Sequence, residues 1–159
     1  MIATLCLLWM AGAAYATMDT KSLTVNATVG ARASMTLSTN TINFPGGDPD
    51  TTPSIPANEN PVTVTVKVRT GSSSTVTLTH QASENLKDGA KSISITKLSW
   101  TAIGAGFVAG TMSKNSEVMA GNWTGPGICT GTFSYFFDNN WEYEPGNYST
   151  LTTYTLTAP

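Results

Sequence analysis

The stretch GICTGTFSYFFDNNWEYEPGNYSTLTTYTLTAP, at residues 127–159, decides the class of fold. Its first half places an apolar or small residue at every second position, at Cys129, Gly131, Phe133, Tyr135 and Phe137. This two-residue period is typical of a half-buried strand. Residues 148–158 repeat the alternation, and Pro145-Gly146 between the two halves favours a turn. The stretch therefore predicts two strands joined as a hairpin, which need an opposing layer to be stable.

The same period extends through the rest of the chain. Residues 62–69, VTVTVKVR, alternate valine with polar residues, and residues 75–80 resume the alternation after a short Gly-Ser turn, which predicts a second hairpin. Charged residues make up only 11% of the 159 residues, threonine is abundant, and no helical period is sustained. We expect one all-β domain at residues 30–159, an antiparallel β-sandwich of seven to nine strands.

The N-terminus has the pattern of an export signal. Residues 2–14 are an apolar run that is too short for an ordinary membrane-spanning helix, and the run ends in Ala14-Tyr15-Ala16. This small-x-small pattern predicts a signal peptide at residues 1–16, although no Lys or Arg precedes the run. We therefore expect a secreted, cell-surface protein with no stable membrane span after cleavage. Cys6 would leave with the peptide, and Cys129 alone, expected to be buried, could form no internal disulfide.

Several functional classes lack the residues they need. The net charge is −2 and the eight basic residues are scattered singly, so no basic stripe is present for nucleic acid. No G-x-S-x-G, H-E-x-x-H or Cys/His ligand cluster occurs. The only histidine, His80, falls at the end of its expected strand, which predicts a position on the rim. We expect no enzyme activity, no cofactor and no metal.

One alternating stretch is too long for a single strand. Every odd position from 23 to 37 is apolar or small, and fifteen extended residues would span about 50 Å. Gly30 is the natural place for a bend that carries the strand from one sheet to the other. Two explanations stay open for residues 17–29, since they could form an edge strand of their own domain or pair along an edge of a neighbouring copy. The candidate interface residues are Leu23, Val25, Ala27 and Val29.

Three segments carry a resemblance to a known family: residues 62–69, KLSWTAIGAGFVAG at 97–110 and EPGNYSTLTTYTLTA at 144–158. Together they resemble secreted bacterial surface proteins with immunoglobulin-like sandwiches, including pilin-like and spore-coat-like fimbrial subunits. In chaperone-usher pilins an alternating N-terminal extension completes the sandwich of the next subunit, which implies that part for residues 17–29. Many such pilins also hold a disulfide and lack a complete C-terminal strand, and this chain departs from both features. The resemblance further implies a tyrosine corner, with the Tyr148 hydroxyl bonded to nearby backbone.

These observations favour an extracellular structural subunit, a pilin-like filament or surface fibre protein that forms a homopolymer by strand addition between protomers. The alternative is a carbohydrate-binding or adhesive module on the cell surface, in which Trp123, Trp141 and Tyr143 stack on the sugar rings of a polysaccharide. Against this alternative, Trp141 and Tyr143 also continue the alternating face of residues 133–137 into the core. An exposed row of these aromatic side chains would favour sugar binding.

Overall fold

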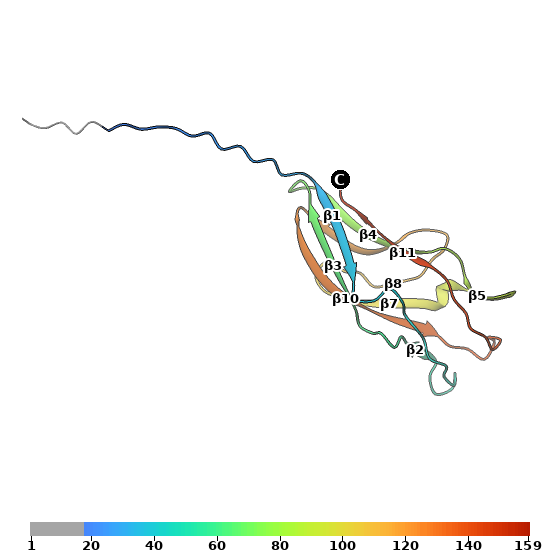
Figure 1. Ribbon diagram of the computed structural model, residues 1–159. Coiled ribbons are helices and arrows are strands. Elements are labelled where there is room, and N and C mark those ends of the chain that lie inside the picture. Colours follow the sequence, from blue (N-terminus) through green and yellow to red (C-terminus); the bar gives the residue numbers. More distant parts are fainter. Residues whose placement is uncertain (1–17) are drawn as a thin grey trace, which may run out of the picture.

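The computed structural model describes residues 18–159, which form two facing antiparallel β-sheets and an extended N-terminal arm (Figure 1). The predicted signal peptide and Cys6 lie outside the described residues. The larger sheet has the strand order β1-β3-β10-β7-β8, with β2 also paired to β10, and the smaller sheet has the order β11-β4-β9. The all-β antiparallel architecture predicted from the sequence is confirmed.

Eleven strands lie within the described residues, and seven of them are six residues or longer. Their bounds are β1 (Arg32–Leu37), β2 (Ser54–Pro56), β3 (Val62–Arg69), β4 (Thr75–Ala82), β5 (Leu86–Asp88), β6 (Lys91–Ile93), β7 (Leu98–Ile103), β8 (Gly110–Thr111), β9 (Val118–Thr124), β10 (Gly127–Asp138) and β11 (Thr152–Thr157). A short 3-10 helix (Ile95–Lys97) precedes β7, and β5 and β6 form a separate two-stranded hairpin.

The sandwich has two ends, which we call the neck and the tip. At the neck the arm joins β1, β3 ends at Arg69, and the Thr70 hydroxyl donates a hydrogen bond to the carbonyl of the C-terminal Pro159 (Figure 1). At the tip the loops 45–61 and 139–147 meet, where Asn139 Nδ2 donates to Gly47 O at 3.1 Å. Directly after the second loop, the Tyr148 hydroxyl donates to Glu144 O at 2.8 Å, so the predicted bond of this tyrosine to nearby backbone is confirmed.

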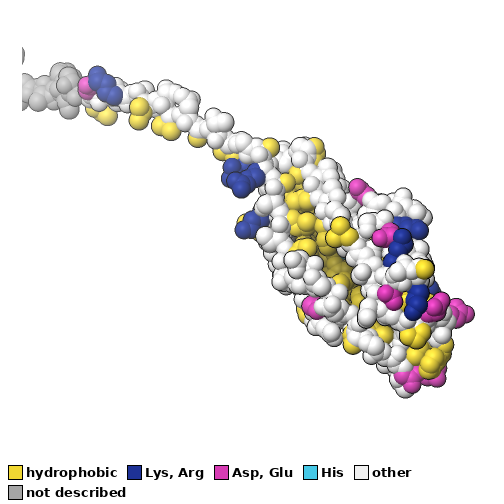
Figure 2. Space-filling view, turned by 45° about the vertical axis from the view of Figure 1, so that its right-hand side comes forward, with side chains coloured by type: hydrophobic (Ala, Val, Ile, Leu, Met, Phe, Trp, Pro, Cys, Tyr) yellow, Lys and Arg dark blue, Asp and Glu magenta, His cyan; other side chains and the backbone are white. Residues whose placement is uncertain are grey.

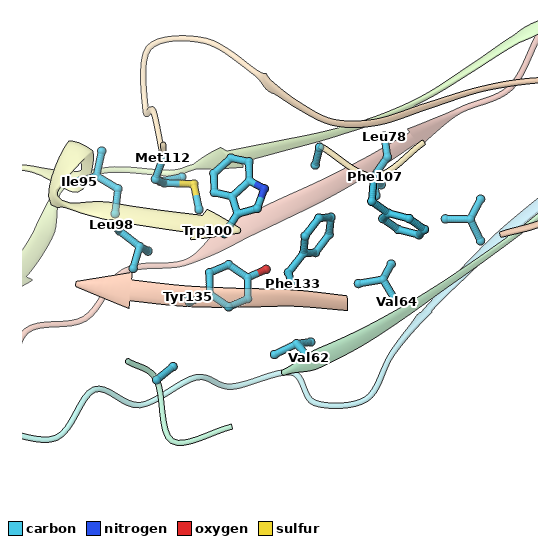
Figure 3. Close-up of a cluster of buried hydrophobic side chains, with 14 residues drawn as sticks. Val62, Val64, Leu78, Ile95, Leu98, Trp100, Phe107, Met112, Phe133 and Tyr135 are labelled. Carbon is cyan, nitrogen blue, oxygen red and sulfur yellow. The ribbon is translucent and has the colours of Figure 1, made fainter. Parts of the chain in front are cut away.

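The core lies between the two sheets and is filled by alternate residues of each strand (Figure 3). Val64 of β3, Leu78 of β4 and Phe133 of β10 are completely buried. Trp100 of β7 meets Phe133 edge to face, with ring centroids 6.4 Å apart, and its indole N–H donates to Val108 O at 2.8 Å. Each such side chain contributes about 1.5–3 kcal/mol by leaving water.

Both predicted hairpins are wrong. β3 lies between β1 and β10 in the larger sheet, whereas β4 lies between β11 and β9 in the smaller one, so residues 70–74 cross from one sheet to the other. β10 and β11 are likewise in different sheets, and the rings of Phe133 and Tyr154 stack across the core at 5.9 Å. Alternation identifies the buried face of a strand, and two strands that face each other across a core have the same pattern as two neighbours.

Candidate functional site

The arm, residues 18–31, has no strand partner within the described chain and extends away from the sandwich (Figures 1 and 2). Its candidate interface residues Leu23, Val25 and Val29 are 88%, 81% and 70% exposed, and Ala27 is exposed as well. The explanation of residues 17–29 as an edge strand of their own domain is therefore wrong for the part described. The ladder begins only at Arg32, and Gly30 marks the point where the chain leaves the domain rather than a bend between sheets.

One lateral side of the sandwich, which we call the open side, is bordered by two free strand edges. β1 is the last strand of the larger sheet and pairs only with β3, whereas β11 is the last strand of the smaller sheet and pairs only with β4. The two strands approach within 8 Å between Cα atoms without forming a ladder, and they separate toward the tip (Figure 1). Each therefore presents unpaired backbone N–H and C=O groups on this side.

The inward-facing side chains on the open side are incompletely covered. On β4 and on β3 up to Val66 such residues are buried, whereas on β11 Tyr154 and Leu156 are only half-buried. On β1 Met35 is half-buried and Leu37 is exposed. Figure 2 shows a hollow band of hydrophobic side chains that runs from the neck along the sandwich. We call this band the groove, and it offers apolar surface together with free strand edges.

A pocket of about 160 Å³ lies between the sheets at the neck. It is lined by apolar residues of β3, β4 and β10 and by the β9–β10 turn, including Val66, Val68, Val76, Trp123 and Cys129. Cys129 is a free thiol and is half-buried, whereas full burial was expected. Cys129 lines this pocket, which accounts for its remaining exposure.

In the core beside the groove, three aromatic side chains contact one another: His80 of β4, Tyr135 of β10 and Tyr154 of β11. The His80 ring stacks on Tyr154 with centroids 3.8 Å apart, and the hydroxyls of Tyr135 and Tyr154 are hydrogen bonded. Burial lowers the pKa of His80 to about 4 and raises the pKa of Tyr135 to about 12. Both tyrosines are therefore neutral at physiological pH, and so is the histidine.

The prediction that His80 lies on the rim is wrong, because the side chain is only 2% exposed. β4 continues past His80 to Ala82, and His80 shares the inward face with Val76 and Leu78. Neither ring nitrogen has a hydrogen-bond partner among the described residues. His80 is thus a packed, neutral core residue.

The opposite lateral side, which we call the closed side, is sealed by residues 104–110. This loop leaves the larger sheet after β7 and bonds to β9 of the smaller one, where Val108 N donates to Ala120 O at 2.9 Å and Asn122 N donates to Gly106 O at 2.8 Å. Gly106 has φ +81°, and a Cβ there would lie 2.2 Å from Trp123 Nε1. The turn therefore requires glycine, and it brings the backbone close against the indole ring.

The three residues predicted for sugar stacking are not brought together. Trp123 is half-buried on the closed side, where its indole N–H donates to Ala105 O at 2.9 Å and its ring meets Phe107 at 5.0 Å. Trp141 is 68% exposed in the tip loop and donates to Asp50 Oδ1 at 3.0 Å. Tyr143 is half-buried against Phe137 at 5.8 Å. No exposed aromatic row is formed by this trio, so the observation that would have favoured sugar binding is not made.

Residues 18–159 also contain no group of three His, Cys, Asp or Glu side chains arranged to hold a metal ion. No helix in this part of the chain is long and apolar enough to cross a membrane.

Sequence reasoning missed the groove as a site. The sequence of β11 did contain an indication of an interaction surface, because this strand carries no charged residue and alternates threonine with Tyr154 and Leu156. Such a sequence is unusual for an edge strand. Searches with family models, with curated protein sequences and with solved structures found no match to this chain. The resemblance to pilin-like subunits therefore stays a prediction from the sequence.

Proposed function

We propose that this protein is an extracellular structural subunit that polymerises by strand addition, in which the arm of one protomer fills the groove of the next. The observation that carries the proposal is that one molecule has both complementary parts, an unpaired alternating arm and an apolar groove between free strand edges. The product would be a pilin-like filament or surface fibre. Export to the cell surface is supported by the apolar N-terminus and its Ala14-Tyr15-Ala16 pattern.

The arm and the groove match in length and in period. Residues 23–29 would extend about 23 Å as a strand, and the six residues of β11 extend about 20 Å. Side chains of a strand alternate between its faces, so Leu23, Val25, Ala27 and Val29 would all face the groove while residues 24, 26 and 28 face water. The exposed apolar side chains of both parts would leave water together.

The backbone on both sides is also suited to pairing. Exposed edges are normally protected by charged residues, proline or bulges. β11 contains none of these charges or prolines, and β1 contains only Arg32 as a charged residue. An added strand bonded to the free edge of β11 would satisfy its unpaired N–H and C=O groups, as in other cases of peptide addition to a sheet.

A charge placed on the apolar face of the arm tests the proposal. The variant Leu23→Asp/Val25→Asp would put two carboxylates into the groove, so we expect a folded protein that fails to form polymers. The matched control Thr24→Asp/Asn26→Asp adds the same charge to the opposite face of the same segment, and we expect it to polymerise. Negative-stain microscopy and sedimentation of the secreted proteins would separate the two results. Equal polymers from both variants would contradict the proposal.

The arm can also be tested as a separate ligand. A synthetic peptide of residues 18–30 should bind the Leu23→Asp/Val25→Asp protein and raise its melting temperature, because a ligand that binds only the folded state stabilises it. The same peptide carrying both aspartates should leave the melting temperature unchanged. A peptide that binds neither in calorimetry nor in melting experiments would show that the groove does not accept this segment.

A further inference from the structure

A cluster of cations lies at the neck, on the outer face of the larger sheet. The register of β1 and β3 places Arg32 directly opposite Arg69, with Lys67 two residues along the same face. Like charges that face each other across two strands destabilise a sheet. Among residues 18–159 none of these three cations forms an ion pair. The isolated molecule therefore keeps a concentration of positive charge that its own carboxylates do not neutralise.

A large apolar side chain lies beside these cations. Ile128 of β10 is paired with Lys67 across the ladder and is 70% exposed. Arg69 also lines a shallow pocket with Val29 and Ala31 of the arm, so the cluster borders the root of the arm. We call Arg32, Lys67, Arg69 and Ile128 the neck patch. It combines unpaired positive charge with exposed apolar surface at the point where the arm leaves the domain.

The tip has the opposite character. Exposed carboxylates gather there on the two loops that meet at this end, at Asp48, Asp50, Glu142 and Glu144 (Figure 2). None of them forms an ion pair within the described residues. Two lysines lie nearby, because Lys91 Nζ donates to Pro145 O at 2.6 Å and Lys97 is paired with Asp138, so the four carboxylates still outnumber the nearby cations. The exposed ring of Trp141 lies among them. We call these four carboxylates and Trp141 the tip patch.

We propose that the neck patch of one protomer docks against the tip patch of the next copy of the chain. The two patches are complementary, since the neck patch has an excess of positive charge, the tip patch an excess of negative charge, and each has one exposed apolar side chain. They lie at opposite ends of the molecule. This inference rests on the proposed strand addition, because the arm brings the two copies together. The arm is rooted at the neck patch, so the root reaches one end of the groove of the acceptor.

The charges determine which end of the acceptor groove, the tip or the neck, receives the root of the arm. With the root at the tip of the acceptor, three cations face four carboxylates; with the root at its neck, two clusters of cations would face each other. β11 runs from the tip at Thr152 to the neck at Thr157, so the favoured arrangement makes the arm antiparallel to β11. Contacts between exposed charges act mainly on orientation and association rate. The patches would thus set the direction and speed of polymer growth.

Charge reversal tests the docking separately from the arm. At about 20 mM salt we expect Arg32→Glu/Lys67→Glu/Arg69→Glu and Asp48→Lys/Glu142→Lys/Glu144→Lys, which reverse the net charge of the neck patch and the tip patch, each to slow elongation by roughly tenfold or more. Elongation is followed by light scattering. When the two reversed proteins are combined into one chain, opposite charges face each other again and elongation should recover. At about 500 mM salt the Debye length is short, so the differences should largely vanish. The control Arg32→Lys/Arg69→Lys keeps the charge and should elongate normally.

The outcomes distinguish the docking from the strand addition itself. If the reversed proteins elongate at the normal rate while Leu23→Asp/Val25→Asp forms no polymer, the docking is wrong and strand addition stands. If the combined six-residue variant elongates as slowly as the two proteins it combines, although circular dichroism shows all variants folded, the docking is also wrong. If Leu23→Asp/Val25→Asp polymerises normally, strand addition fails. Slowing by each single-end reversal, recovery in the combination and loss of the effect in salt would together support the docking.

Discussion

The two lateral sides of the sandwich end in different ways. On the closed side, residues 104–110 leave the larger sheet and bond to β9 of the smaller one, with Phe107 inserted between Trp123 and Phe133. On the open side, β1 and β11 have no such bridge, and Tyr154 and Leu156 remain half-exposed. The fold therefore closes one side with its own chain and leaves the other to be covered.

The contrast shows that the two sides differ in how the border of the core is covered. Exposed apolar patches on soluble proteins commonly mark interaction sites. Exposed apolar side chains also occur singly elsewhere, for example at Ile103 and Leu151, but on the open side and on the arm they follow an alternating strand pattern. A half-finished core at one border together with a free alternating segment is better explained by assembly than by poor packing.

Truncation on the closed side should have the largest effect on stability. Phe107 is almost fully buried, and its ring contacts Trp123 at 5.0 Å and Phe133 at 5.6 Å. Phe107→Ala would leave a cavity and remove the ring that seals this border, so we expect a loss of about 3–5 kcal/mol in the free energy of unfolding. Urea denaturation of the arm-charged monomer would measure it. A loss below about 1 kcal/mol would show that the closed side is not closed by packing.

The positions of the strands could be predicted from the sequence, but the pairing of each strand with its neighbours could not. A strand was predicted at residues 61–70, and β3 forms within it at Val62–Arg69. Valine at every second position places all the apolar side chains on one face, which fixes the face that is buried. The link of residues 70–74 is as short as a hairpin turn, yet it crosses between sheets. Loop length alone does not decide between these outcomes. Long-range packing does, and one sequence does not display it.

The candidate site could be predicted in part. The alternation at residues 23–29 identified the arm as surplus strand, and the structure leaves it unpaired. The groove depends on which strands end each sheet, and that order follows from pairings that the sequence did not reveal. His80 was misplaced because its strand was ended two residues too early. Ala82 continues the inward parity and was the signal available.

The histidine behind the open side should make stability depend on pH. Burial lowers the pKa of His80 to about 4 from an ordinary value near 6.5. Between these two pH values the unfolded chain therefore binds a proton at His80 and the folded protein does not. Stability should therefore fall as the pH drops from about 6.5 to about 4, by up to about 3 kcal/mol. Urea unfolding at a series of pH values would measure the slope.

A matched variant isolates this histidine from the carboxylates. His80→Phe keeps a ring for stacking on Tyr154 and loses no hydrogen bond, because neither nitrogen has a partner among the described residues. The free energy of unfolding of the variant should not change between about pH 6.5 and 4.5, where ordinary carboxylates are still mostly ionised. An unchanged slope in His80→Phe would assign the pH dependence to other groups.

Truncation on the open side should have the smallest effect on the monomer and a clear effect on assembly. Leu156 is half-buried on the free edge strand β11, so Leu156→Ala should cost only about 1 kcal/mol of unfolding free energy, below the range for a fully buried leucine. Its side chain lines the groove, where the arm would complete its burial. We therefore expect about tenfold weaker binding of the peptide of residues 18–30, measured by calorimetry.

Thr155→Ala serves as the control, because it changes the outer face of the same strand and should leave the binding of that peptide unchanged. Equal peptide affinity for Leu156→Ala and Thr155→Ala would mean that the arm does not lie over Leu156. The arm would then not cover the core on the open side in the way that Phe107 covers it on the closed side.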